Sequence, residues 1–165
     1  MENGTPEVII RRASTAEDAQ SIIAMIQELA DFESMPNGPK IGRDQLLDDI
    51  HKKYCHAFLA YTGSEPVGYM VYYYAYSTWE GRYAFMEDLY VRPDSRKQGI
   101  GMALWRHLAK IAIDEKLSRI EFSVLDWNEN AIRFYEKVGA VSMKQKEGWE
   151  LYRLYPENIA KLAKS

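Results

Sequence analysis

The strand predicted at Tyr83–Val91 organises the chain. Apart from Glu87 and Asp88, apolar residues stand at both its odd and its even positions, which is typical of a central strand buried on both faces. Pro93 ends the strand, because proline donates no hydrogen bond to a ladder. Apolar residues then follow Gly101 at helical spacing, at Leu104, Trp105, Leu108, Ile111 and Ala112. We therefore expect a strand, a polar turn and a helix in this order.

The same patterns predict the remaining elements. Strands are expected at residues 8–12, 56–62, 67–76 and 119–125, and in a final hairpin formed by 140–145 and 149–155. A helix should follow the S-x-x-E capping box Ser14–Glu17, and residues 31–42 should form a loop. Shorter helices are expected around Leu46–Ile50, at 130–138 before Gly139, and from Pro156. The sequence predicts a single α/β (α+β) domain over residues 1–165, in which a mixed sheet has a central β–α–β unit at Tyr83–Leu125.

Composition narrows the class of protein. A net charge of −3 gives no indication of nucleic-acid binding and tolerates a small cationic partner. The single cysteine, Cys55, permits no internal disulfide and suits a reducing compartment. The sequence has no run of 18 apolar residues and no signal peptide, so we expect a cytoplasmic protein with no membrane partner. His51 and His56 lack Cys or acidic partners at ligand spacing, so we interpret them as surface residues and expect no metal site.

The loop that connects the predicted strand to the predicted helix indicates an anion site. Its sequence is Arg96-Lys97-Gln98-Gly99-Ile100-Gly101. A helix N-terminus leaves backbone N–H groups unpaired, and glycines let an anion approach them closely. We interpret the stretch as a phosphate or pyrophosphate site, with a simple tight turn as the alternative. A P-loop would need Gly-Lys-Ser/Thr, and a dinucleotide loop would need a small residue where Leu104 stands, so neither fits.

Two further features carry candidate chemistry. Glu87 and Asp88 interrupt an apolar strand, and charged groups are rarely buried without a partner. We interpret them as a base or a cation anchor facing a cleft, with an ion pair to Arg82 or Arg119 as the alternative. Tyr135 lies on one face of the predicted 130–138 helix, where a tyrosine by itself is more often a core residue than a catalyst.

Two motifs resemble signatures of the GNAT superfamily of N-acetyltransferases. The first motif, Arg96-x-x-Gly99-x-Gly101, is similar to the acetyl-CoA pyrophosphate loop of that superfamily. The second motif, at residues 128–139, is similar to its second signature and reads Asn-x-x-Ala-x-x-Phe-Tyr-x-x-x-Gly. From Val8 to about Tyr155 the chain resembles the spermidine/spermine (diamine) N-acetyltransferase family. The residues that carry this resemblance are Glu28–Ala30, Glu33, Leu46-Leu47, Tyr72-Tyr73, Trp79-x-Gly81, Glu87-Asp88, Trp127-Asn128 and Glu147–Trp149. The resemblance implies a mixed, largely antiparallel GNAT-type sheet, acetyl-CoA as co-substrate, and a homodimer.

The resemblance also implies roles for individual residues. Acetyl-CoA would be bound by Leu89, Tyr90, Val91, Arg96, Lys97, Gln98, Gly99, Ile100, Gly101, Met102, Asn128, Glu129, Asn130, Ala131 and Tyr135. The amine would be bound by Phe32, Glu33, Ser77, Thr78, Trp79, Glu87, Asp88, Leu125 and Glu147. The two catalytic residues would be Tyr135, which protonates the departing thiolate, and Glu87, which takes a proton from the amine. Asp88 is the alternative base.

Departures from the polyamine enzymes bear on the substrate. Phe32 stands where those enzymes carry a tyrosine, whereas Ser77-Thr78 and Leu125-Asp126 resemble the branch that prefers thialysine, S-(2-aminoethyl)-cysteine. We therefore expect an N-acetyltransferase for the terminal primary amine of a small molecule, thialysine or a related ω-amino acid first. Diamines and polyamines are the alternative substrates. A non-catalytic acetyl-CoA-binding module and a protein acetyltransferase are the alternatives from other classes.

Overall fold

The computed structural model describes residues 7–164, and the chain divides into two compact units, Met1–Ser123 and Val124–Ser165. The first unit holds the strands β1 (Val8–Arg12), β2 (His56–Thr62), β3 (Glu65–Ser77), β4 (Gly81–Val91) and β5 (Ile120–Phe122). Its helices are α1 (Ala16–Phe32), α2 (Arg43–His51), the 3₁₀ turn η1 (Pro93–Ser95) and α3 (Ile100–Asp114). The second unit holds α4 (Glu129–Lys137), α5 (Met143–Glu147) and α6 (Pro156–Ala163).

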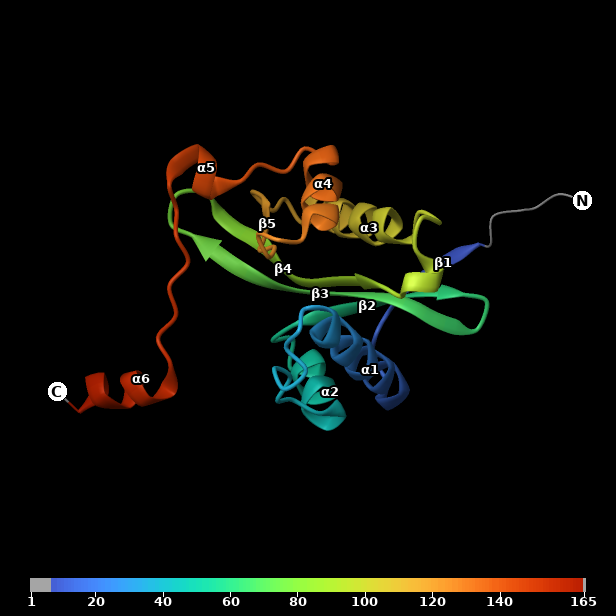
Figure 1. Cartoon of the computed structure of the whole chain (residues 1–165), viewed down its shortest axis with the longest axis horizontal. Helices are drawn as coiled ribbons and strands as arrows, with labels where there is room; N and C mark the ends of the chain where they lie inside the picture. The colour runs from blue at the N-terminus through green and yellow to red at the C-terminus, as the bar shows by residue number, and fades with distance from the viewer. Residues whose placement is uncertain (1–6, 165) are drawn as a thin grey trace, which may run out of the picture. The chain divides into compact units, whose positions relative to one another are not determined.

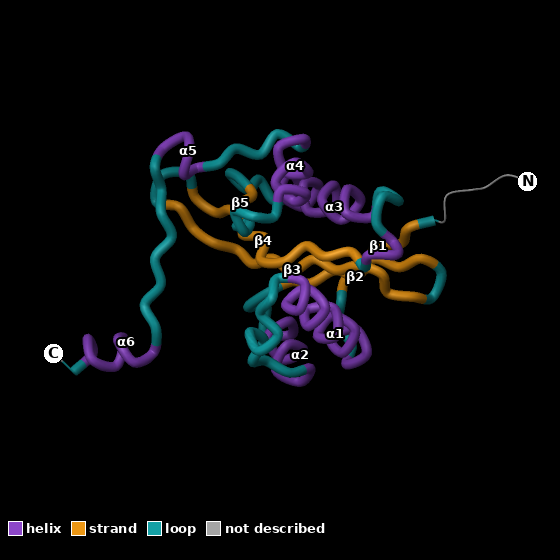
Figure 2. The backbone as a smooth tube through the Cα atoms, viewed as in Figure 1, coloured by secondary structure: helices purple, strands orange, loops and turns teal. Residues whose placement is uncertain are grey.

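The first unit is a sheet covered by helices on both faces. Its strand order is β1-β2-β3-β4-β5, with antiparallel pairing up to β4 and parallel pairing between β4 and β5. Helices α1 and α2 lie against one face of the sheet and α3 against the other (Figures 1 and 2). The predicted mixed, largely antiparallel sheet is confirmed, and β4, α3 and β5 form the predicted central β–α–β unit.

Alternation along β2 and β3 builds a core on each face of the sheet. Leu59 and Tyr69 belong to the cluster that packs against α1 and α2, together with Ile22 and Met25 of α1. Phe58 points to the opposite face, where its ring centroid lies 4.5 Å from that of His107 on α3. Successive residues of a strand face opposite sides, so this division follows from the twofold period of the backbone.

A β-bulge in β4 changes which face its residues occupy. Asp88 lies opposite Val71 and Met86 lies opposite Tyr72, so Glu87 is an extra residue without a partner position on β3. Without the bulge, Asp88 would share a face with Met86, two residues away. With it, Asp88 shares the face of Val71, beneath α1 and α2.

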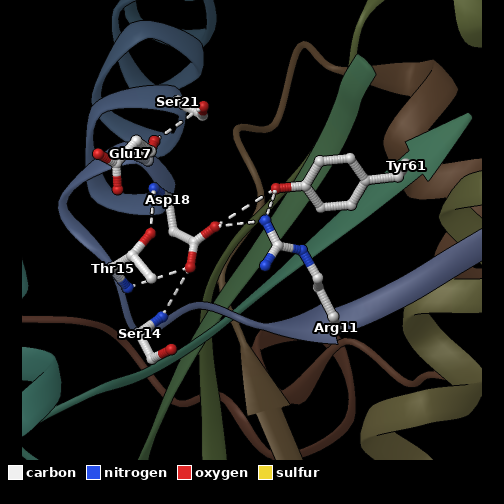
Figure 3. A network of polar contacts seen from close by, with 7 residues as sticks. All are labelled: Arg11, Ser14, Thr15, Glu17, Asp18, Ser21 and Tyr61. Atoms are coloured by element: carbon white, nitrogen blue, oxygen red, sulfur yellow. Dashed lines mark hydrogen bonds and ion pairs between the residues drawn. The ribbon is translucent and has the colours of Figure 1, made fainter. Parts of the chain in front are cut away.

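A buried carboxylate fastens the start of α1 to the sheet, and this region corrects one prediction. The capping box is formed by Thr15 and Asp18, one residue later than the predicted Ser14–Glu17. Asp18 is 1% exposed and accepts hydrogen bonds from the backbone N–H groups of Ser14 and Thr15. Arg11 Nη2 lies 2.8 Å from its Oδ1, and the Tyr61 hydroxyl donates to the same oxygen (Figure 3).

Replacing Asp18 by asparagine is expected to lower the free energy of unfolding by about 2–4 kcal/mol, because it removes the charge that several buried donors face. Urea unfolding followed by circular dichroism measures the loss. Asp48→Asn is the control, since Asp48 pairs with Lys52 on an exposed helix face and should cost under about 1 kcal/mol. Equal losses in the two variants would contradict this role for Asp18.

The same contact makes part of the stability depend on pH. Burial alone raises the pKa of Asp18, but hydrogen bonds from Ser14 and Thr15 and the charge of Arg11 bring it below the ordinary value of 3.8. A carboxyl whose pKa is lowered by folding stabilises the folded state above its unfolded pKa. This stabilisation should therefore be complete at neutral pH and be lost as the pH falls below 3.8.

His56 is buried, contrary to the prediction of a surface residue. It lies on β2 with 7% of its surface exposed, and its ring stacks on Tyr72 at 5.1 Å between centroids. Arg12 Nη2 lies 2.8 Å from Nδ1, and because arginine only donates, Nδ1 accepts and Nε2 carries the proton. Burial and the charge of Arg12 lower the pKa of His56. His51, by contrast, is exposed as predicted.

The predicted C-terminal hairpin is wrong in this structure. Within the second unit, Ser142 accepts a hydrogen bond from the backbone N–H of Gln145 and starts α5, which ends at Gly148 in a left-handed conformation (φ 79°). Residues 149–155 follow as a loop, teal in Figure 2. The predicted 119–125 strand is also shortened to Ile120–Phe122. The 130–138 helix and the helix from Pro156 are confirmed within about one residue.

Candidate functional site

The start of α3 has the features of an anion site. Gly99 is the N-cap in a left-handed conformation (φ 80°), no side chain caps the first turn, and that turn contains no acidic residue. Lys97 is also left-handed (φ 63°). A Cβ atom at Gly99 would meet nothing within 4 Å, so the space beside its Cα is open. The predicted pyrophosphate loop therefore lies at a helix N-terminus whose donors are not capped by a side chain.

Arg96 joins this loop to the neighbouring strand and to α1. Its Nε donates to the carbonyl oxygen of Val91 at 2.8 Å. Its guanidinium carbon lies 5.8 Å from the ring centroid of Phe32 and 5.7 Å from that of Tyr90. The structure thus brings Arg96, a predicted cofactor residue, next to Phe32, a predicted amine residue.

An ion pair supports the same end of β4. Arg92 donates through Nη2 and Nε to the carboxylate of Glu28 on α1, at 2.9 and 3.1 Å, and Nη1 donates to the carbonyl of Pro66. The Tyr90 hydroxyl donates to the same Glu28 carboxylate at 3.0 Å. These contacts fix α1 against the strand from which the loop departs.

The backbone at the end of β4 is paired on one side. Parallel pairing with β5 covers Ala84, Phe85 and Met86 and ends there, whereas pairing with β3 continues to Val91. Among the described residues, Leu89–Val91 thus have a strand neighbour only on the β3 side. This is the stretch predicted to hold the pantetheine arm through its backbone.

Acidic residues surround Asp88, which lies on the face of the sheet beneath α1 and α2. The Tyr69 hydroxyl donates to Oδ2 of Asp88 at 3.0 Å. The pKa of Asp88 is raised to about 6, and burial is the largest cause. The hydrogen bond from Tyr69 lowers this pKa, whereas the nearby charges of Glu87 and Glu33 raise it. Burial also raises the pKa of Glu33, which caps the end of α1. The structure therefore gathers three of the predicted amine residues, Glu33, Glu87 and Asp88.

Arg82 and Arg119 do not form the ion pair with Glu87 or Asp88 that was the alternative interpretation of these carboxylates. Arg82 pairs with Glu115 at 3.2 Å. Arg119 pairs with Glu80 and Glu121 at 2.6 and 2.9 Å. Both cations are thus engaged by other carboxylates.

The predicted residues Ser77, Thr78 and Trp79 lie at the tip of the β3–β4 hairpin. Ser77 pairs with Gly81, whereas Asp88 lies opposite Val71, six residues earlier on β3, a separation of about 20 Å along the strand. The Ser77 hydroxyl accepts hydrogen bonds from the backbone N–H groups of Trp79 and Glu80. Within the first unit the structure therefore does not bring this group together with the acidic cluster.

The remaining predicted residues belong to the second unit. Asn128 caps α4, with Oδ1 accepting from the backbone N–H of Ala131, and Glu129, Asn130 and Tyr135 lie on the helix. The partly buried Tyr135 ring contacts that of Phe134 edge to face at 5.5 Å. Leu125 lies before α4, and the exposed Glu147 ends α5 and accepts a hydrogen bond from Trp149 Nε1.

Over residues 7–164, no three or more His, Cys, Asp or Glu side chains are placed to hold a metal ion. Within the same range, none of the helices combines the length and the apolar character that a membrane span requires. Both observations concern the described residues alone.

Sequence reasoning missed Tyr69. It lies in a run of aromatic residues on β3 that reads as core packing, and it is indeed fully buried. Its hydrogen bond to Asp88 depends on the pairing of β3 with β4 and on the bulge, and neither is encoded in a local pattern.

Comparison with known proteins agrees with this arrangement. The model of the "Acetyltransferase (GNAT) family" matches residues 22–140, which include the loop at Gly99 and Tyr135. The chain belongs to the GNAT acetyltransferase family. The match reaches from α1 through α4 and so includes both predicted motifs.

Two curated relatives cover almost the whole chain. A thialysine N-epsilon-acetyltransferase of Caenorhabditis elegans is 44% identical over 149 residues, covering 90% of this chain and 93% of its own. A protein of the same name from Bos taurus is 36% identical, covering 94% and 97%. A solved integron cassette protein of Vibrio cholerae superimposes with a TM-score of 0.75 at 23% identity, covering 96% of this chain and 98% of that one, and so supports the fold.

As a GNAT acetyltransferase, the protein is an N-acetyltransferase that uses acetyl-CoA as co-substrate. The residues present fit this molecule, because acetyl-CoA carries a pyrophosphate and the α3 N-terminus offers an uncapped turn beside the cations Arg96 and Lys97. The left-handed Gly99 leaves open space in front of that turn. The one-sided backbone at Leu89–Val91 offers hydrogen-bonding groups for an extended amide chain.

Proposed function

We propose that this protein acetylates the terminal primary amine of a small ω-amino acid, with thialysine as the first candidate. The observation that carries the proposal is the acidic cluster of Glu33, Glu87 and Asp88, because clustered carboxylates attract a cationic amine. The names of the two curated relatives support the choice of thialysine.

The proposed acetyl-CoA site uses the residues that the sequence predicted. The backbone of Leu89, Tyr90 and Val91 would bind the pantetheine arm, and the loop from Arg96 to Met102 would bind the pyrophosphate. The family resemblance adds Asn128 to Ala131 and Tyr135 to these residues. In support, the N-terminus of α3 favours an anion, and Gly99 lets the anion approach the backbone.

The amine must lose a proton before it can attack. A lysine-like amine has a pKa of about 10.4, so it arrives as an ammonium at neutral pH. Glu87 is the proposed base, directly or through a water molecule, and Asp88 is the alternative within the same pair. A carboxylate with a pKa near 6, as at Asp88, is deprotonated at pH 7 and close enough to neutrality for general base catalysis.

The acetyl group would then pass directly from sulfur to nitrogen. The amine nitrogen forms a bond to the carbonyl carbon, the carbon–sulfur bond breaks, and Tyr135 donates its hydroxyl proton to the departing thiolate. The nitrogen then loses its second proton, which restores the Tyr135 hydroxyl. Backbone N–H groups near Leu89 would polarise the thioester carbonyl. Holding the two substrates in line supplies much of the remaining acceleration.

Phe32 and Leu125 are the basis for choosing an ω-amino acid over a polyamine. A second distant cation on spermidine needs a carboxylate or a hydroxyl along the groove, and neither side chain provides one. We propose that the Ser77 and Thr78 hydroxyls bind the α-amino or α-carboxylate group of the amino acid. Their hairpin tip lies about 20 Å along β3 from Asp88 of the same chain.

We also propose a homodimer in the cytoplasm. The dimer follows from resemblance to the diamine acetyltransferase family, and the location from the single cysteine, Cys55, which suits a reducing compartment. Size-exclusion chromatography with light scattering tests the assembly.

The substrate prediction is that thialysine has a higher kcat/KM than spermidine by about one to two orders of magnitude, since one charged or hydrogen-bonded contact is worth about 1.5–3 kcal/mol. Parallel kinetics with thialysine, lysine, putrescine and spermidine at saturating acetyl-CoA measure the ratio. Phe32→Tyr restores the missing hydroxyl and should narrow it. If spermidine is the better substrate, the ω-amino-acid proposal is wrong, while an acetyltransferase remains.

A further inference from the structure

The buried hydroxyl of Tyr69 has a specific partner in the acidic cluster. Tyr69 lies on β3 with 0% of its surface exposed and donates to Oδ2 of Asp88 at 3.0 Å. Burial and then the negative charge of Asp88 raise the pKa of the Tyr69 hydroxyl, so this group stays protonated and is a permanent donor. One oxygen of the Asp88 carboxylate is therefore held by the core of the protein.

The contact exists because of the bulge. Tyr69 pairs with Tyr90, and Val71 pairs with Asp88, which places Asp88 on the same face as Tyr69. If β4 continued without Glu87 as an extra residue, Asp88 would turn to the α3 face and lose this donor. The bulge and the tyrosine together determine where the carboxylate points.

We propose that Tyr69 is a positioning residue that makes Asp88, rather than Glu87, the proton acceptor of the pair. This inference rests on the proposed acetylation and assigns the proton to the residue given above as the alternative base. Tyr69 fixes Oδ2, which leaves Oδ1 to receive the proton of the substrate ammonium. In that step an N–H bond of the ammonium breaks, its electron pair stays on nitrogen, and an O–H bond forms on Asp88, giving a neutral amine and a neutral carboxylic acid.

The surroundings of Asp88 determine the direction of the expected effect. The titratable groups that face it are Tyr69 on β3, Glu33 at the end of α1, and Glu87 on its own strand. Burial and the two glutamates favour the protonated acid, whereas the Tyr69 hydrogen bond favours the carboxylate. Loss of the hydroxyl should therefore raise the pKa of Asp88 above its value of about 6.

Tyr74 provides a matched control. It lies on the same strand as Tyr69, it is partly buried, and its hydroxyl also donates to a carboxylate, at 2.7 Å. Its acceptor, however, is Glu115, which forms an ion pair with Arg82 and is not among the proposed bases. Tyr74→Phe thus removes a similar hydrogen bond without altering Asp88.

The test is the pH dependence of kcat/KM for thialysine in the wild type, Tyr69→Phe and Tyr74→Phe. The wild type should lose activity as the pH falls through about 6. In Tyr69→Phe this acid limb should move upward by about one pH unit, with roughly a fivefold loss at pH 6 that recovers above pH 8. Tyr74→Phe should keep the wild-type limb.

A second set of variants covers the case in which Tyr69→Phe is poorly folded. Asp88→Asn should remove the acid limb, and Tyr69→Phe added to Asp88→Asn should cause no further loss, because the tyrosine acts through Asp88. An unshifted limb in folded Tyr69→Phe, a loss uniform at all pH values, or additive losses in the double variant would overturn the inference. These results are distinct from failure of the proposed function, in which the wild type itself would not acetylate thialysine.

Discussion

Replacing Tyr135 by phenylalanine is expected to lower kcat by roughly 10²-fold, as expected for the loss of a general acid. The substitution keeps the aromatic ring that contacts Phe134 in α4 and removes only the hydroxyl. The Kd for acetyl-CoA should stay within several-fold of the wild-type value. Steady-state kinetics together with isothermal titration calorimetry separate the two effects.

Tyr152→Phe is the matched control in the same unit, because Tyr152 is 89% exposed and has no proposed role. It should leave kcat unchanged. Using a substrate whose amine has a lower pKa should not rescue Tyr135→Phe, since the defect concerns the leaving thiolate. A kcat near the wild-type value in Tyr135→Phe would make Tyr135 a packing residue of α4.

Replacing Gly99 by valine is expected to weaken acetyl-CoA binding by roughly 10²-fold, since losing one charge-assisted contact costs about 1.5–3 kcal/mol. A Cβ atom at this position meets nothing within 4 Å in the protein. It would instead fill the open space where we propose that the pyrophosphate lies. Calorimetry with acetyl-CoA measures the change.

Backbone strain must be separated from this effect, because Gly99 has a φ of 80° that β-branched residues disfavour. Gly63→Val is the control, since Gly63 also has a positive φ, of 61°, and open space around it, but lies in the β2–β3 hairpin. Both variants should lose stability, and only Gly99→Val should lose affinity. Similar affinities for the two would remove Gly99 from the proposed pyrophosphate site.

Features encoded locally could be predicted from the sequence. The apolar run before Pro93 and the helical spacing after Gly101 predicted β4 and α3, because strand and helix periods are properties of short segments. Capping was less certain, because Thr15–Asp18 overlaps Ser14–Glu17 by three residues and either pair can close a box.

Features that depend on strand pairing could not be predicted. The position of Asp88 beneath α1 follows from the bulge at Glu87, and a bulge is a property of the β3–β4 register. For the same reason the sequence predicts His56 as a surface residue and gives no indication of the contact between Tyr69 and Asp88. The pattern at 140–155 suits a hairpin, but Ser142 provides a helix cap that starts α5 instead.

The measurement that tests the account most directly follows CoA release and product formation together. Wild-type protein is mixed with acetyl-CoA and thialysine, free thiol is titrated, and the product is analysed by NMR. We predict equal amounts of CoA and of product, with the acetyl group on the side-chain nitrogen. Binding of acetyl-CoA without CoA release for thialysine, lysine, putrescine or spermidine would contradict the account and indicate a non-catalytic binding module.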